Sequence, residues 1–156
     1  MRLFSQHGKQ SGMTLLELIM ACAILMVLSS AALPIARVTV MRQKEAELRA
    51  ALRELRTSID RYKDMADRNL FRVEVGSEGY PPDLETLVNG VTFGADDRRV
   101  RFLRRIPVDP MTGRAEWGLR AIQDDPKSTS WSGKNVFDVF SLSQGTGLDG
   151  TRYAEW

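Results

Sequence analysis

The chain has 156 residues, enough for one domain or for a small domain with an appendage. Its 22 Lys and Arg residues against 20 Asp and Glu residues give a formal charge of +2, far from the basic excess of a dedicated nucleic-acid binder. One Cys excludes an intramolecular disulfide, and one His, His7, excludes His-based metal sites and most nucleophile–base pairs.

An apolar segment dominates the N-terminal quarter of the chain. Residues 18–36 are nineteen positions without a charge, and residues 13–16 extend the apolar run backwards past Glu17. A helix over 13–36 would measure roughly 36 Å, which is enough to cross a bilayer core. We therefore predict a transmembrane helix. The alternatives are a buried core helix, rarely apolar on every face, and a secretory signal peptide, which Glu17 disfavours.

Glu17 stands inside this apolar segment. A carboxylate there costs about 2.5–3.5 kcal/mol at mid-helix and less near an end. It is retained where a partner cation is supplied, or where it reaches the lipid headgroups from a helix end. Pro34, near the other end of the segment, predicts a bend, because proline removes a backbone donor and clashes with the preceding turn.

The residues around Glu17 resemble the processing signature of type IV pilin-like proteins, which carry class III signal sequences. A short basic leader, residues 1–12, ends in Gly12 and is followed by the apolar Met13. Glu17 is the fifth residue counted from Met13. Pro34 is the twenty-second, where many members of that family carry a helix-bending proline.

This resemblance implies a route of processing and assembly. A prepilin peptidase would cut between Gly12 and Met13, and the new amine of Met13 would be N-methylated. The carboxylate of Glu17 would pair with the N-terminal amine of a neighbouring subunit in a filament. Glu17 is then an assembly residue, and we predict no enzymatic activity. The alternative from a different class is a bitopic enzyme or binding domain on a plain anchor.

A helical stripe follows the apolar segment. Its members are spaced 7, 4, 3, 4, 3 and 4 residues apart: Met41, Leu48, Leu52, Leu55, Ile59, Tyr62 and Ala66. The i,i+4 pairs Glu45–Arg49 and Asp64–Arg68 also favour a helix. We predict one helix over 13–68, roughly 84 Å long if unbroken, whose stripe packs on the head. A soluble coiled coil is the alternative.

The residues after the stem predict a small head that is part of an α+β fold. Residues 79–88 indicate a turn and a short helix with Asp83 near its start. Residues 115–122 and 135–141 alternate as strands do, and an antiparallel sheet built from them would cover the stem. In chain order the predicted parts of this pilin-like architecture are a cleaved leader (1–12), a transmembrane and filament-core helix (13–36), an amphipathic helical stem (37–68) and a periplasmic head (69–156).

The head resembles the major pseudopilin of type II secretion systems. The resemblance lies in YPPDLETL at 80–87, LRRIPVDP at 103–110, FDVFS at 137–141 and the terminal Trp156. It implies a single-pass protein of the bacterial inner membrane that forms a homo-oligomeric filament and drives protein export across the outer membrane. Its implied partners are other pseudopilins, prepilin peptidase, and an assembly platform with its ATPase. The alternative is a pilin or minor pilin of a type IV pilus or DNA-uptake pseudopilus, which shares the same N-terminus.

Many major pseudopilins bind calcium in the loop after the last strand. Here that loop is 141–151, and the candidate ligands are Asp149 and the upstream Asp138. Calcium takes roughly 6–8 oxygen ligands, usually including several carboxylates, and the closely spaced acidic pattern of the family is missing. The alternative is a glycine-rich loop held by its own hydrogen bonds.

Arginines crowd into one short stretch of the head: Arg98, Arg99, Arg101, Arg104 and Arg105. A solvated or subunit-facing surface is the simplest interpretation. An anionic partner such as DNA is the alternative, but interleaved aromatic residues for base stacking are nearly absent. We therefore expect no nucleic-acid partner.

Overall fold

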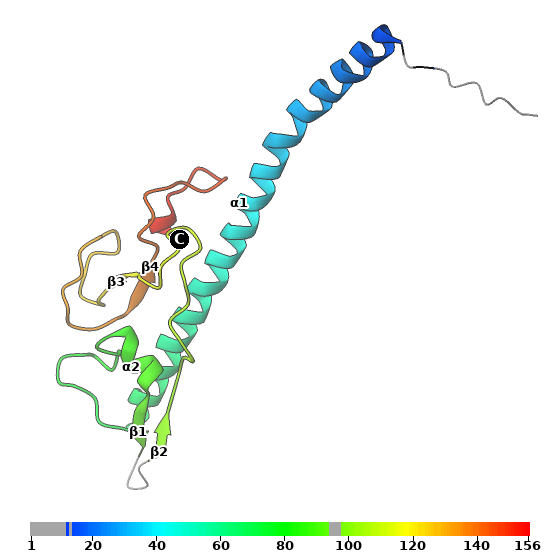
Figure 1. Ribbon diagram of the computed structural model, residues 1–156. Coiled ribbons are helices and arrows are strands. Elements are labelled where there is room, and N and C mark those ends of the chain that lie inside the picture. The colour runs from blue at the N-terminus through cyan, green and yellow to red at the C-terminus, as the bar shows by residue number, and fades with distance from the viewer. Residues whose placement is uncertain (1–11, 13, 94–97) are drawn as a thin grey trace, which may run out of the picture. The chain divides into compact units, whose positions relative to one another are not determined.

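A computed structural model describes residues 12, 14–93 and 98–156, apart from the side chains of 31–35 and Arg98. Its elements are α1 (Leu15–Asp67), α2 (Leu84–Asn89), β1 (Val91–Phe93), β2 (Arg98–Val100), β3 (Gly118–Arg120), β4 (Asp138–Phe140) and the 3-10 helix η1 (Tyr153–Glu155). One long helix followed by small antiparallel sheets confirms the predicted α+β, pilin-like fold (Figure 1).

The chain divides into two compact units, Met1–Val40 and Met41–Trp156, and each is described by itself. The first unit contains the apolar turns of α1, and the second contains its amphipathic turns and the head. The 53 residues of α1 include Pro34, so the backbone is helical at that position. The Pro34 side chain lies outside the described residues, and the bend there stays a prediction.

The predicted stripe of α1 forms the core of the second unit. Its buried members are Leu48, Leu52, Leu55, Ile59, Tyr62 and Ala66. All of these except Ala66 belong to one core cluster with head residues that include Leu87, Val136 and Val139. Burying a large apolar side chain of this stripe contributes about 1.5–3 kcal/mol to the stability of the fold. Because the head covers the stripe, the stripe is not available to pair with a second helix in a coiled coil. Met41 differs, because 37% of it remains exposed.

The short helix α2 begins where Asp83 predicts. The Asp83 Oδ1 atom accepts hydrogen bonds from the backbone N–H and the hydroxyl of Thr86, both at 2.7 Å. The helix ends at Gly90, whose φ of 78° is the left-handed region that glycine tolerates. A Cβ on Gly90 would lie 2.4 Å from the carbonyl oxygen of Val100, so glycine also allows β2 to approach α2 closely.

The predicted antiparallel sheet is present as the β3–β4 pair, and a second antiparallel pair, β1–β2, was not predicted. The strands β3 and β4 lie within the two predicted segments but have three residues each, with Gly118 opposite Phe140. Beyond these three residues, backbone groups of the predicted segments bond to side chains and turns and do not extend the strands. For example, the N–H of Ile122 donates to Asn135 Oδ1 at 3.1 Å. The hairpin of β1 and β2 was missed, because its charged second strand lacks the alternation of a half-buried strand.

A buried carboxylate joins the middle of the head to its C-terminal loop. Asp109 is fully buried, and its oxygens accept hydrogen bonds from the N–H of Met111 at 2.7 Å and the hydroxyl of Ser141 at 2.6 Å. Buried polar groups need such partners, because an unpaired one costs free energy. Asp109 therefore fixes the point from which the C-terminal loop departs.

Replacing Gly118 with alanine is expected to lower the free energy of unfolding by about 1–3 kcal/mol. The new Cβ would lie 2.3 Å from two ring carbons of Phe140, so the ring must move. Urea unfolding of the full-length protein measures the effect. In the double variant Gly118→Ala/Phe140→Leu the loss should be less than the sum of the two single losses. Additive losses would show that the ring is not the obstacle.

Candidate functional site

The N-terminal site begins with a small helix cap. Thr14 precedes α1, and its hydroxyl oxygen accepts a hydrogen bond from the backbone N–H of Glu17 at 3.3 Å, in the manner of an N-cap. The carbonyl of Thr14 accepts from the N–H of Leu18 at 3.1 Å. Glu17 thus lies in the first turn, where the helix dipole favours a negative charge. Its side chain is exposed, and no cation pairs with it among the described residues.

Gly12 is exposed, and a Cβ added there would meet no atom within 4 Å. Glycine is therefore not required at this position by the fold of this chain. Met13, the other residue of the predicted cleavage bond, lies outside the described residues.

The first turns of α1 present apolar side chains to all sides. The large ones are exposed by half or more of their surface: Leu15, Leu16, Leu18, Ile19, Met20, Ile24, Leu25, Met26, Val27 and Leu28. A contiguous apolar surface of this kind marks an interaction with another protein or a membrane. Across the described residues, no helix combines the length and the apolar character that a membrane crossing needs.

The two candidate calcium ligands lie in different hydrogen-bond networks. Asp138 sits between two guanidinium groups: Arg56 Nε donates to its Oδ1 at 2.8 Å, and Arg120 Nη1 lies 3.3 Å from its Oδ2. Both oxygens therefore have cationic partners already. This surrounding does not suit a metal ion, because two arginines repel a cation and occupy the oxygens it would need.

The carboxylate of Asp149 bonds to groups of its own loop. Its Oδ1 accepts hydrogen bonds from the N–H of Thr151 at 3.0 Å and from the hydroxyl of Thr151 at 2.7 Å. The two bonds lower the pKa of Asp149, and Arg49 acts in the same direction. In the part of the chain that the structure describes, no group of three or more His, Cys, Asp or Glu residues gathers as a metal site.

The arginine cluster is split between a strand and an extended segment. Arg98 and Arg99 belong to β2, and Arg101, Arg104 and Arg105 follow it. The side chains of Arg99, Arg101, Arg104 and Arg105 are exposed, and none pairs with a carboxylate among the described residues. An exposed, unpaired position agrees with a solvated or subunit-facing surface.

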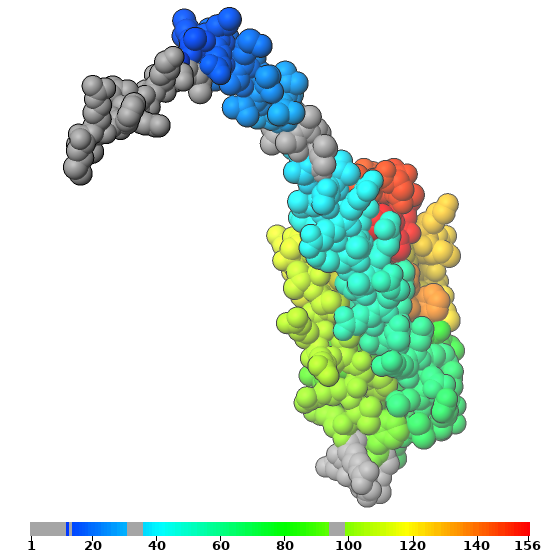
Figure 2. All heavy atoms as spheres, turned by 90° about the vertical axis from the view of Figure 1, so that its right-hand side faces the viewer, coloured from blue at the N-terminus to red at the C-terminus, as the bar shows by residue number. Residues whose placement is uncertain are grey.

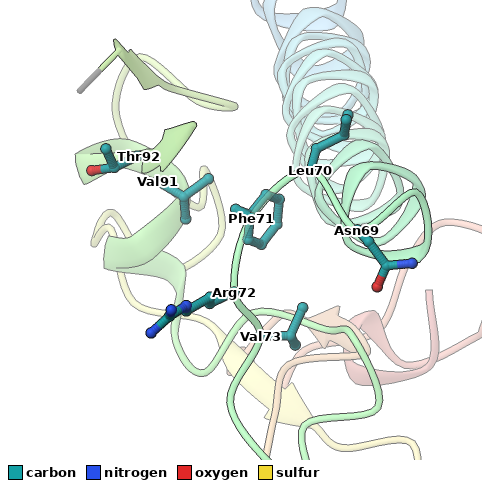
Figure 3. Close-up of a pocket in the computed structure, with 7 residues that line it drawn as sticks. All are labelled: Asn69, Leu70, Phe71, Arg72, Val73, Val91 and Thr92. Atoms are coloured by element: carbon teal, nitrogen blue, oxygen red, sulfur yellow. The ribbon is translucent and has the colours of Figure 1, made fainter. Parts of the chain in front are cut away.

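A hollow of about 1050 Å³ opens beyond the C-terminal end of α1 and is lined by residues 69–73, Val91 and Thr92. Figure 3 shows the ring of Phe71 between the end of α1 and Val91 of β1. Arg72 is the single ionisable side chain among these lining residues. The hollow therefore offers no acid–base pair of its own for catalysis.

Sequence reasoning missed Glu45, the most buried carboxylate of the stem. The predicted Glu45–Arg49 pair is not formed. Glu45 is only 5% exposed, and it accepts hydrogen bonds from the backbone N–H of Leu148 and the hydroxyl of Tyr153. Burial raises the pKa of Tyr153, and the charge of Glu45 raises it further, so the phenol stays a donor. The sequence feature that could have indicated its burial is the position of Glu45 between Met41 and Leu48, two members of the apolar stripe. The second predicted pair, Asp64–Arg68, is present at 2.9 Å.

Comparison with known proteins finds one match, at the N-terminus. Residues 7–33 match the prokaryotic N-terminal methylation motif, and the matched stretch includes Gly12, Met13 and Glu17. The motif supports a type IV pilin-like protein that is a substrate of prepilin peptidase. No curated protein and no solved structure matches the chain. The matched residues end before the head. The motif therefore supports a type IV pilin-like protein but does not distinguish a secretion pseudopilus from a pilus.

Proposed function

We propose that this protein is a structural subunit of a periplasmic filament, cut by prepilin peptidase between Gly12 and Met13. The single observation that carries the proposal is the spacing of Gly12, Met13 and Glu17 at the start of the apolar helix. The methylation motif covers the cleavage bond, and Glu17 follows it in the first turn of an apolar helix. The fold and the motif support processing at the N-terminus and packing of subunits along that helix.

Assembly follows from the charges at this end. Cleavage creates a positive amine on Met13, and Glu17 supplies a carboxylate without a cation among the described residues. Two such charges on adjacent subunits pair in a low-dielectric filament core, which favours one register over others. The exposed apolar side chains of the first turns would be buried by neighbouring copies.

The same arrangement implies where the subunit waits before assembly. We propose that residues 13–36 hold it in the bacterial inner membrane, with the head in the periplasm. An assembly platform and its ATPase would add subunits from the membrane. The chain's role is structural and not catalytic.

The particular filament we propose is the pseudopilus of a type II secretion system, with this chain as its major pseudopilin. The support is the order of the head segments at 80–87, 103–110 and 137–141, which resembles that family. Deleting the gene tests it: the expected result is loss of exported proteins from the medium. Loss of surface pili or of DNA uptake, with export intact, would instead assign the chain to a type IV pilus or a DNA-uptake pseudopilus.

The mature chain is expected to begin at Met13 with a methylated amine, which intact-mass spectrometry of the purified protein measures. A Gly12→Val variant should keep its leader, because the side chain blocks the approach of the peptidase to the bond. Its folding should be unchanged, since the Cβ of residue 12 meets nothing within 4 Å. Gln10→Val is the matched control and should be cut normally. A mature chain that starts elsewhere would refute the assignment.

A further inference from the structure

The C-terminal loop of the head lies along the middle turns of α1, as Figures 1 and 2 both show. This is the loop in which resemblance to pseudopilins places calcium. We infer that three α1 side chains, Glu45, Arg49 and Arg56, hold the loop in place of a metal ion. The stability of the head is then independent of calcium. The inference rests on contacts within the second compact unit and does not depend on the proposed function.

Glu45 binds the loop at Leu148 and the η1 turn that follows the loop at Tyr153. Its Oε1 accepts hydrogen bonds from the N–H of Leu148 at 2.7 Å and the hydroxyl of Tyr153 at 3.3 Å. The loop backbone can come this close because residue 147 is glycine. A Cβ on Gly147 would lie 2.6 Å from Trp156 and 3.3 Å from Glu45 Oε1. A buried carboxylate thus receives backbone and hydroxyl donors, an arrangement stronger than neutral hydrogen bonds.

Two arginines, one and three turns further along α1, bind Asp149 of the loop and Trp156 beyond it. The guanidinium carbon of Arg49 lies 4.1 Å from the ring centroid of Trp156, a cation–π contact, and its Nη2 lies 3.9 Å from Asp149 Oδ2. Arg56 Nη2 donates to the main-chain oxygen of Trp156 at 2.7 Å. The same guanidinium binds Asp138, so Arg56 connects the end of the loop to β4.

The loop also uses its own oxygens. The hydroxyl of Thr151 accepts a hydrogen bond from Trp156 Nε1 at 2.6 Å, and the carbonyl of Thr151 accepts from the N–H of Gly147 at 2.8 Å. These oxygens, like those of Asp149, are the kind that would have to turn toward a cation. Forming a calcium shell would break each of these contacts.

Charge leads to the same conclusion. The carboxylates of Glu45, Asp138 and Asp149 are matched in number by the guanidinium groups of Arg49, Arg56 and Arg120. A divalent cation would add two positive charges to this balanced cluster, close to three guanidinium groups that repel it. Arginine side chains and a calcium ion are therefore alternative ways to neutralise the carboxylates of this loop and hold it on α1.

The first test compares the melting temperature of full-length protein in EDTA and in excess calcium chloride. Calcium bound at one hundred times its Kd would raise the melting temperature by about 5–10 °C for a domain of this size. We expect no difference between the two conditions. A rise of that size in calcium would overturn the inference.

The second test follows amide hydrogen exchange by mass spectrometry in variants of α1. Glu45→Ala and Arg56→Met should speed exchange in residues 141–156 at least about tenfold relative to the 48–62 core. Arg53→Met is the matched control, because Arg53 is exposed on the same helix and makes no hydrogen bond or ion pair in the described structure. An unchanged ratio of loop to core exchange would overturn the inference, even where a variant is less stable overall.

Discussion

Replacing Glu17 with leucine is expected to abolish incorporation of the subunit into filaments while leaving cleavage at Met13 intact. The substitution makes the helix more apolar, so a plain anchor would tolerate it well. In the filament that we propose, however, it would leave the Met13 amine of a neighbour without its counter-charge. Removing one partner of a buried pair costs about 3–5 kcal/mol, which corresponds to a loss of about 100-fold or more in assembly. Sheared filaments and exported protein measure the outcome.

The matched control for this experiment is Glu47→Leu. Glu47 is an exposed glutamate of the same helix, and its contact is a hydrogen bond from Gln43 at 3.1 Å. It should assemble normally if loss of charge alone is harmless. Normal assembly and export by the Glu17→Leu protein would refute the pairing mechanism and leave a simple membrane anchor.

Replacing Asp138 with alanine is expected to lower the free energy of unfolding by about 2–3 kcal/mol, a drop in melting temperature of about 4–10 °C. The carboxylate is 25% exposed and serves both Arg56 and Arg120. Without it, Arg120, which is only 11% exposed, keeps its bonds to main-chain oxygens but loses its counter-charge. The cost comes from this uncompensated charge more than from the lost hydrogen bonds.

Asp60→Ala controls for the loss of a carboxylate, because Asp60 is exposed on α1 and has no ion pair in the described structure. It should leave the melting temperature nearly unchanged. The double variant Asp138→Ala/Arg120→Met should recover part of the loss, since it removes one stranded cation. Equal melting temperatures for the Asp138→Ala and Asp60→Ala proteins would show that the cluster is not a stabilising contact.

Local features of the head were predictable in different degrees. The N-cap at Asp83 was evident because capping requires a side chain only three residues from the N–H it serves. The stripe of α1 was evident because helical periodicity repeats within one element. The β1–β2 pair was missed because its second strand, Arg98–Val100, begins with two arginines and lacks the alternation of a half-buried strand.

The sequence by itself determined the N-terminal methylation signature and the long helix, because each rests on residues a few positions apart. Only the tertiary structure decided which charges meet. Glu45 was expected to pair with Arg49 four residues away, yet it bonds to Leu148, 103 residues further on. Glu45 is only 5% exposed, and a buried carboxylate costs free energy unless donors reach it, whereas the half-exposed Arg49 would lose little by lacking a partner. The path of the chain brings the backbone N–H of Leu148 to this carboxylate. The partner of a charge is thus set by what burial leaves unsatisfied, and sequence spacing does not contain that information.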